Sequence, residues 1–105
     1  MTIDLTSKID VTSRLSPEQA RKVLAEIFNH SPNLVSFTKH AREQMRERDL
    51  KSGDVLNVLK AGKILSVPDF ENGSFRYRVQ TNKITVVLAF KKPNHVVVVI
   101  TAWRD

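Results

Sequence analysis

The chain of 105 residues contains no cysteine, which excludes disulfide bonds and metal sites built from thiolates. It has no apolar run near the roughly 18 residues that a bilayer span requires. Its first ten residues, MTIDLTSKID, lack the apolar segment of a signal peptide. These absences predict a cytoplasmic protein that makes no contact with a membrane.

The common motifs of cofactor binding and catalysis are also missing. There is no Gly-rich phosphate loop, no serine elbow and no signature of paired carboxylates. The three histidines, His30, His40 and His95, include no closely spaced pair, so the sequence predicts no zinc site. We therefore expect a protein that needs neither a metal nor a cofactor.

Acidic residues are few relative to basic ones. Seventeen Lys and Arg against eleven Asp and Glu give a net charge of +6. Residues 63–105 carry seven basic and three acidic groups, whereas residues 1–62 carry ten and eight. Such a balance favours a polyanionic partner, nucleic acid first or else a strongly acidic protein surface. The length and the 41% hydrophobic content predict a single domain over residues 1–105.

The second half of the chain has the pattern of a β-meander. Runs rich in β-branched and aromatic residues alternate with turn residues such as Asn72-Gly73, which is typical of antiparallel strands. The segment Val96 to Ile100 is apolar at every position, which favours a central strand. The expected strands are 75–80, 84–91 and 96–103, with a first short strand at 63–67 and a polar turn region over 68–74.

The first half is expected to be helical. Ser16-Pro17 opens a helix that runs to Phe28, and residues 1–15 are compatible with either an edge strand or a loose arm. Gly62 occupies the place of a left-handed residue after a helix. The further helices run from a cap at Ser36 or Thr38 to about Asp49, and from a cap at Ser52 to Ala61. The predicted fold class is α+β, with N-terminal helices packed on one face of a three- to four-stranded antiparallel sheet.

The helix expected after Thr38 carries the first candidate site residues. At 100° per residue, Ala41 and Met45 form its buried stripe, and His40 and Arg48 lie at the margin of that stripe. Position alone is compatible with a packing or capping role for these two residues as well as with catalysis. Two further arginines, Arg42 and Arg46, are expected to face solvent.

The strands carry the second group of candidates. In FRYRV, Arg76 and Arg78 share one face, and Tyr77 lies on the other. Two neighbouring arginines need either solvent or an anion, and their guanidinium groups suit phosphate. Simple alternation predicts that Thr101 and Trp103 share a face with Val97 and Val99, where a lone tryptophan is more often a core residue.

These residues together resemble the RelE-like toxins, in particular a branch with a His-Ala helix akin to the BrnT and MqsR toxins. The resemblance rests on His40-Ala41, Met45, Arg48-Asp49-Leu50, an arginine-bearing strand and the final VITAWR. It covers residues 37–104 of a RelE-like core at 37–105, whereas residues 1–36 form an N-terminal arm and an extra helix outside it. It implies a RelE/barnase-like fold.

The resemblance also implies a function, that of a metal-independent endoribonuclease toxin of a type II toxin–antitoxin pair. Its partners would be RNA and a cognate antitoxin protein. Such an enzyme lets the ribose 2′-OH attack the phosphodiester, which requires a proton acceptor and cations on the phosphate oxygens. The residues implied as catalytic are His40, Arg48, Arg76, Arg78 and Thr101, and those implied as substrate-binding are Tyr77, Lys91 and Arg104.

Two other functions remain open from the sequence. A non-catalytic module of the same fold could bind a protein or a nucleic acid, because no unambiguous catalytic set is present. A DNA-binding regulator is disfavoured because no helix-turn-helix pattern is apparent. One geometric question decides among them: if the helices cover the Phe75 face of the sheet, Arg76 and Arg78 point away from His40 unless an edge brings the two sides together.

Overall fold

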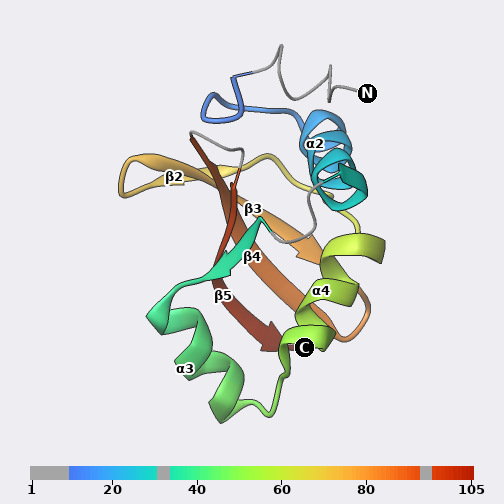
Figure 1. Cartoon of the computed structure of the whole chain (residues 1–105), viewed down its shortest axis with the longest axis vertical. Helices are drawn as coiled ribbons and strands as arrows, with labels where there is room; N and C mark the ends of the chain where they lie inside the picture. Colours follow the sequence, from blue (N-terminus) through green and yellow to red (C-terminus); the bar gives the residue numbers. More distant parts are fainter. Residues whose placement is uncertain (1–9, 31–33, 93–95) are drawn as a thin grey trace.

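The computed structural model describes residues 10–30, 34–92 and 96–105, so the beginning of the predicted arm and His95 lie outside the described residues. Within these ranges the fold is α+β, with three helices and one five-stranded mixed sheet (Figure 1). The helices are α2 (Pro17–His30), α3 (Lys39–Glu47) and α4 (Ser52–Ala61). The strands are β1 (Val35–Phe37), β2 (Asp69–Glu71), β3 (Ser74–Gln80), β4 (Ile84–Lys91) and β5 (Val96–Arg104).

Two of the helices begin at residues whose side chains accept from free backbone amides, and the third begins at a residue whose own amide donates to a side chain of the first turn. At the start of α2, Ser16 N donates to Gln19 Oε1 at 3.0 Å and Gln19 N donates to Ser16 Oγ at 3.1 Å, which is a capping box. Thr38, and not Ser36, caps α3 by accepting from the amide of its third residue at 3.0 Å. The cap of α4 is Lys51 rather than the predicted Ser52, and Lys51 N donates to Asp54 Oδ2 at 2.9 Å.

The sheet has the strand order β1-β5-β4-β3-β2. The predicted meander β3-β4-β5 is antiparallel, but the sheet has five strands rather than three or four, and β1 pairs with β5 in parallel. The strand predicted at 63–67 is reduced to an isolated bridge between Lys63 and Gln80. Instead, β2 forms inside the predicted turn region, where Asn72 and Gly73 adopt positive φ angles of 50° and 80° and reverse the chain into β3.

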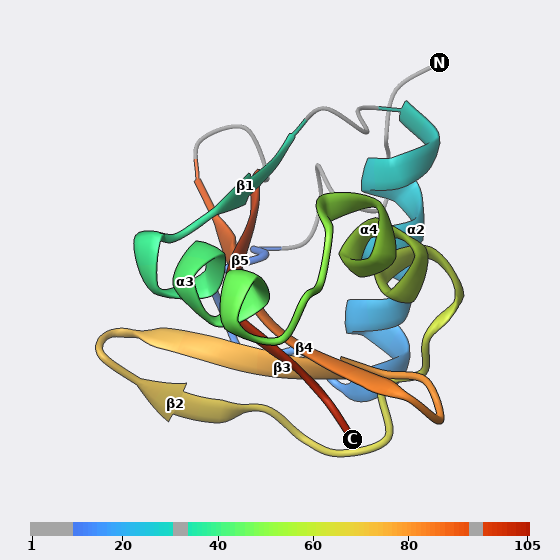
Figure 2. The same cartoon turned by 90° about the horizontal axis from the view of Figure 1, so that it is seen from below.

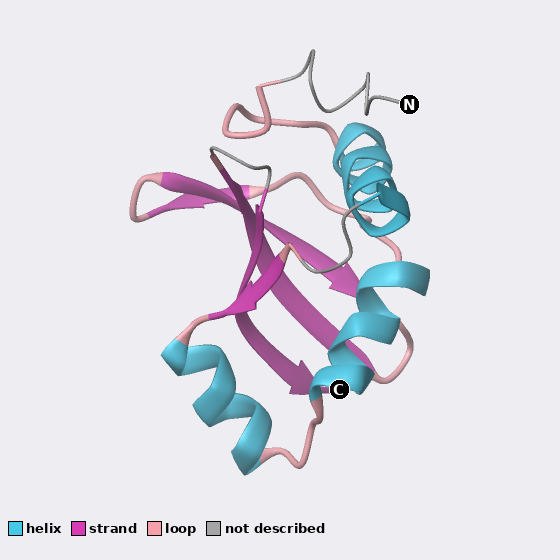
Figure 3. Ribbon diagram, viewed as in Figure 1, coloured by secondary structure: helices cyan, strands magenta, loops and turns pink. Residues whose placement is uncertain are grey.

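All three helices contribute to one core on the same side of the sheet (Figure 2), and Figure 3 distinguishes the helices from the strands by colour. The core is the apolar layer between them, formed on the helix side by residues such as Leu24 and Leu59 and on the sheet by Val79, Leu88 and Val99. These five residues are essentially inaccessible to solvent. The fold therefore leaves the other side of the sheet without a helix among the described residues.

The junction between α2 and α4 is closed by Arg21. Its guanidinium donates to the carbonyl oxygens of Gly62 at 2.7 Å and Leu59 at 2.6 Å, the last acceptors of α4. Burial lowers the pKa of Arg21 from its usual value. Gly62 itself has φ −72° and not the predicted left-handed conformation; its place is set by close packing, because a Cβ there would lie 2.8 Å from Val79 Cγ1.

Candidate nucleic-acid interface on the open face of the sheet

A β-bulge interrupts β5 at Ile100. Val99 pairs with Leu88 and Thr101 pairs with Val87, so two steps on β5 correspond to one step on β4. Ile100 is the extra residue. A bulge of this kind changes which side of the sheet the following side chains occupy.

Because of the bulge, Thr101 and Trp103 lie on the face of the sheet opposite to the one predicted from the sequence. Before Ile100, the buried residues are Val97 and Val99; after it, Thr101 and Trp103 are partly exposed. Simple alternation places all four side chains on one face, which the register contradicts. Thr101 and Trp103 instead lie on the side of the sheet away from the helices.

We call this side of the sheet the open face. Arg78 on β3 lies opposite Val87 on β4, and Val87 lies opposite Thr101 on β5, so the three form one row across the strands. With about 4.8 Å between neighbouring strands, the Cα atoms of Arg78 and Thr101 are about 10 Å apart. The residues of the open face are Arg76, Arg78, Gln80, Thr85, Val87, Ala89, Lys91, Val96, Val98, Thr101 and Trp103, of which Thr85, Val87 and Ala89 are buried.

The two arginines of the open face contact carboxylates on β2. Arg76 Nη1 lies 4.0 Å from Glu71 Oε1, and Arg78 Nη2 lies 3.6 Å from Asp69 Oδ2. Both carboxylates are more than 60% exposed, and ion pairs of this kind contribute little to stability. Arg76 is only 21% exposed, and its buried Nε has no hydrogen-bond partner among the described residues. A bound phosphate would compete with Asp69 and Glu71 for these guanidinium groups.

The start of α3 is fastened to the bulge through Thr38. Thr38 N donates to the carbonyl of Val99 at 3.0 Å, and Thr38 Oγ1 donates to the carbonyl of Ile100 at 3.1 Å. His40 follows Thr38 by two residues, and Thr101 follows Ile100 by one. We call these two hydrogen bonds the tether. The tether holds the segment that bears His40 against the segment that bears Thr101.

This tether lies at an edge of the sheet. The pairing of β1 with β5 ends at Phe37 and Val99, so β5 has no strand beyond it from Ile100 onward among the described residues. The helix α3 follows along this part of β5 (Figure 1). His40 is exposed, and no hydrogen bond of its side chain is found in the described part of the chain. The edge is thus the place where the helix side and the open face approach each other.

Arg48 and Arg104 lie at the other end of α3. Arg48 is the C-cap residue, and its guanidinium donates to Gln44 Oε1. Arg104 donates from Nε to the carbonyl of Arg48 at 3.1 Å and from Nη2 to the carbonyl of Asp49 at 2.9 Å. These bonds satisfy carbonyl groups at the end of the helix. Nine residues of α3 span about 13 Å, which separates both arginines from His40.

Tyr77 and Lys91 complete the candidates. Tyr77 is 1% exposed; its hydroxyl accepts from Leu15 N at 3.0 Å and donates to the carbonyl of Ser13 at 3.4 Å. Burial raises the pKa of Tyr77 above its usual value. Tyr77 therefore ties the segment before α2 to the core. Lys91 is partly exposed at the far end of β4, four residues or about 13 Å from Val87 along the strand.

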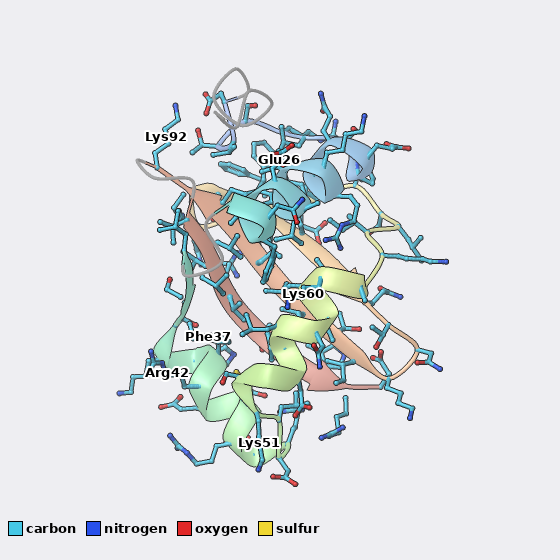
Figure 4. The ribbon with its side chains drawn as sticks, turned by 45° about the vertical axis from the view of Figure 1, so that its right-hand side comes forward. Glu26, Phe37, Arg42, Lys51, Lys60 and Lys92 are labelled. Atoms are coloured by element: carbon cyan, nitrogen blue, oxygen red, sulfur yellow. The ribbon has the colours of Figure 1, made fainter. Side chains whose placement is uncertain are left out.

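The outer side of α3 carries positive charge. Arg42 and Arg46 are exposed, as predicted, and neither has an ion pair within the described ranges. Figure 4 shows Arg42 on the side of α3 turned away from α4. At the opposite end of the molecule, Lys92 Nζ pairs with Asp10 Oδ1 at 3.1 Å.

In the described residues, no group of three or more His, Cys, Asp and Glu side chains could hold a metal ion. No helix of this part of the chain is both long and apolar enough to cross a membrane.

Comparisons with known proteins give one match. Residues 37–104 match a family model described as a domain of unknown function, DUF4258. The matched segment begins at the last residue of β1 and ends at the last residue of β5, so it contains α3, the bulge and the open face. Neither the curated proteins nor the solved structures contain a significant match.

Proposed function

We propose that this chain, which belongs to the DUF4258 family, binds single-stranded RNA and cleaves it as a metal-independent endoribonuclease toxin of the RelE-like class. The observation that carries the proposal is the hydrogen bond from Thr38 to the carbonyl of Ile100 at 3.1 Å. This hydrogen bond supports a close approach of His40 to Thr101 at the edge of the sheet. Thr101 lies in the same row across the strands as Arg78. A cognate antitoxin would be the protein partner.

In the proposed reaction, neutral His40 accepts the proton of a ribose 2′-OH. The 2′-oxygen forms a bond to phosphorus, the bond to the 5′-oxygen breaks, and the leaving 5′-oxygen takes a proton from solvent. The products are a 2′,3′-cyclic phosphate and a free 5′-OH. Arg78 and the Thr101 hydroxyl stabilise the charge that develops on the non-bridging oxygens.

The remaining candidates take lesser roles in this proposal. Arg76 lies on the open face two residues from Arg78 and supplies a second positive charge. Arg48 and Arg104 hold the end of α3, and Tyr77 holds the core, so the proposal assigns them no contact with RNA. Lys91 lies far enough from Thr101 to contact only a neighbouring part of the RNA.

The test is cleavage of a labelled single-stranded RNA by the purified full chain. His40→Ala is expected to lower the rate about 10²- to 10⁴-fold, the usual effect of removing a general base. Glu47→Gln changes another exposed residue of α3 and is the matched control, with an unchanged rate expected. In a host cell, expression of the natural chain is expected to arrest growth and His40→Ala to relieve the arrest. Equal cleavage by His40→Ala and the natural chain would refute the proposed mechanism.

A second function, RNA binding without cleavage, is favoured by one observation. Asp69 and Glu71 already contact the two arginines of the open face, which is a disadvantage for an enzyme that must stabilise extra negative charge. Binding and cleavage separate the two functions. A chain that binds RNA through Arg78, leaves it intact and does not impair growth would be the non-catalytic module.

A further inference from the structure

Trp103 is the single tryptophan of the chain, and it lies on the open face. The bulge at Ile100 puts it there, two residues beyond Thr101 on the same side of β5. It is partly exposed, and it is not among the residues that form or pack against the hydrophobic core. A large aromatic side chain at such a position has a surface that the fold itself does not use.

The edge of the indole ring is fixed by Asp105. Trp103 Nε1 donates to Asp105 Oδ1 at 3.1 Å. The same carboxylate accepts from Thr85 Oγ1, at 3.3 Å to Oδ1 and 3.1 Å to Oδ2, and Asp105 N donates to the carbonyl of Lys83 at 2.7 Å. These bonds set the orientation of the ring through its polar edge, and they leave the π faces without a hydrogen-bonding role.

The neighbours of Trp103 on the open face include Thr101 and Gln80, whose polar groups can form hydrogen bonds with a nucleotide. Thr101 lies one two-residue step away, about 6.8 Å along the strand. Gln80 lies in the same row as Trp103, on the other side of Thr85, so the two Cα atoms are about 10 Å apart. An amide offers both donors and an acceptor, which suits the edge of a base.

We propose that Trp103 is a stacking platform for an unpaired base of the RNA, with Gln80 facing the edge of that base. This inference rests on the proposed function, because it assumes that the phosphate of the same nucleotide lies at Thr101 and Arg78. Aromatic side chains on an exposed sheet bind single-stranded nucleic acids in this way, since every base has a π face. The site selects unpaired RNA, because a base inside a duplex cannot reach the ring.

Trp103 is its own reporter, since no other tryptophan contributes to the fluorescence. The experiment uses the full chain with His40→Ala, so that the RNA stays intact, and a short labelled single-stranded RNA. Binding is expected to quench the tryptophan fluorescence in a saturable way. An oligonucleotide of the same length with abasic sites, and a duplex of the same sequence, are expected to quench it much less.

Variants give the second readout. Trp103→Ala is expected to weaken RNA binding about 5- to 150-fold in fluorescence anisotropy, the range of one stacked base. Trp103→Phe keeps an aromatic face and is expected to retain most of the affinity. Binding of the abasic oligonucleotide is expected to be the same for the natural residue and for Trp103→Ala. The circular dichroism spectrum controls for folding, and the quenching experiment needs no variant at Trp103.

The outcomes separate the two proposals. If RNA binds and Arg78→Ala weakens it, but Trp103 is neither quenched nor needed, the stacking platform is refuted and the proposed function stands. Equal quenching by the single strand and the duplex also refutes the platform. If the chain binds no RNA at all, both proposals are refuted.

Discussion

Thr38 and Ile100 are joined by a hydrogen bond of 3.1 Å between a hydroxyl and a backbone carbonyl, across 62 residues of sequence. Thr38 is the N-cap of α3, and Ile100 is the bulge residue of β5. One side chain therefore starts a helix and holds it to the strand whose register sets the open face.

Replacing Thr38 with valine keeps the shape of the side chain and removes its hydroxyl. We expect a loss of about 1–2 kcal/mol in the free energy of unfolding, because the N-cap bond and the bond to the Ile100 carbonyl are both lost. Urea denaturation measures it. The proposed site adds a second expectation: the rate of RNA cleavage by Thr38→Val falls by more than its loss of stability explains. Thr38→Ser keeps the hydroxyl and is expected to retain both the stability and the cleavage rate of the natural chain. Ser36→Ala, at the exposed position of β1, is the control. If Thr38→Val lowered the stability without any effect on cleavage, the tether would have no part in the activity.

The contact of Asp69 with Arg78 predicts that the carboxylate of Asp69 weakens RNA binding. Asp69→Asn is expected to raise the affinity about 2- to 5-fold, the range of an exposed ion pair. Fluorescence anisotropy at a fixed salt concentration measures the change. Glu18→Gln removes one negative charge from α2 and is expected to have no such effect. An equal gain in both variants would mean that only the net charge matters.

Tyr77→Phe removes one oxygen atom from the core. Leu15 N would then lose its acceptor in a buried place, so we expect a loss of about 1–3 kcal/mol in the free energy of unfolding. Thermal or urea denaturation measures this loss. Phe75→Leu, a change of a partly exposed residue on the same strand, provides a comparison in which no hydrogen bond is lost. An unchanged stability of Tyr77→Phe would show that water replaces the hydroxyl.

Tyr77 also predicts the behaviour at alkaline pH. Its pKa is raised in the folded chain because burial disfavours the phenolate. The neutral hydroxyl therefore adds stability that is fully present below the unfolded pKa of about 10 and is lost as the pH rises through the folded pKa. Because Tyr77 is the only tyrosine, the tyrosinate absorbance titrates it directly. Ionisation at the ordinary pKa, without unfolding, would contradict the buried hydroxyl.

Two glycines of the α4 region are expected to respond in opposite ways to alanine. At Gly62 a Cβ would lie 2.6 Å from the carbonyl oxygen of Val58, so Gly62→Ala should destabilise the chain by about 1–3 kcal/mol. At Gly53, inside α4, no atom beyond the adjoining residues and the helix's own backbone lies within 4 Å of such a Cβ, and Gly53→Ala should stabilise by about 0.4–1 kcal/mol. Urea midpoints of the two variants compare them directly, and a change of the same sign in both would refute the argument.

Local chemistry predicts much of the fold. The capping box at Ser16 and the apolar spacing of the helices, like the β-branched runs of β3, β4 and β5, are signals contained in a few neighbouring residues. By contrast, β1 and β2 have three residues each, too few for a pattern, and they form because a neighbouring strand offers them hydrogen bonds. The position of Gly62 after a helix predicts a left-handed conformation, whereas contacts with β3 determine its role.

The candidate site was harder to predict for the same reason. The opposite faces of Arg78 and Tyr77 follow from alternation and agree with the register. The face on which Thr101 and Trp103 lie does not follow from alternation. It is set by the bulge, which depends on the pairing of β5 with β4 and on the tether at Thr38. The engagement of Arg104 with the end of α3 likewise joins residues 55 and 56 positions apart, beyond any local pattern.

The extra residue at Ile100 has an evolutionary consequence. A relative that lacked this one residue would pair Val99 with Leu88 and Thr101 with Val87 as consecutive residues, so the bulge would disappear while the threonine and the tryptophan kept their places on the outer side of β5. The length of β5 can therefore differ by one residue at this point without any exchange of polarity over the last four positions, and functional homologues are expected to differ there in whether they have the bulge.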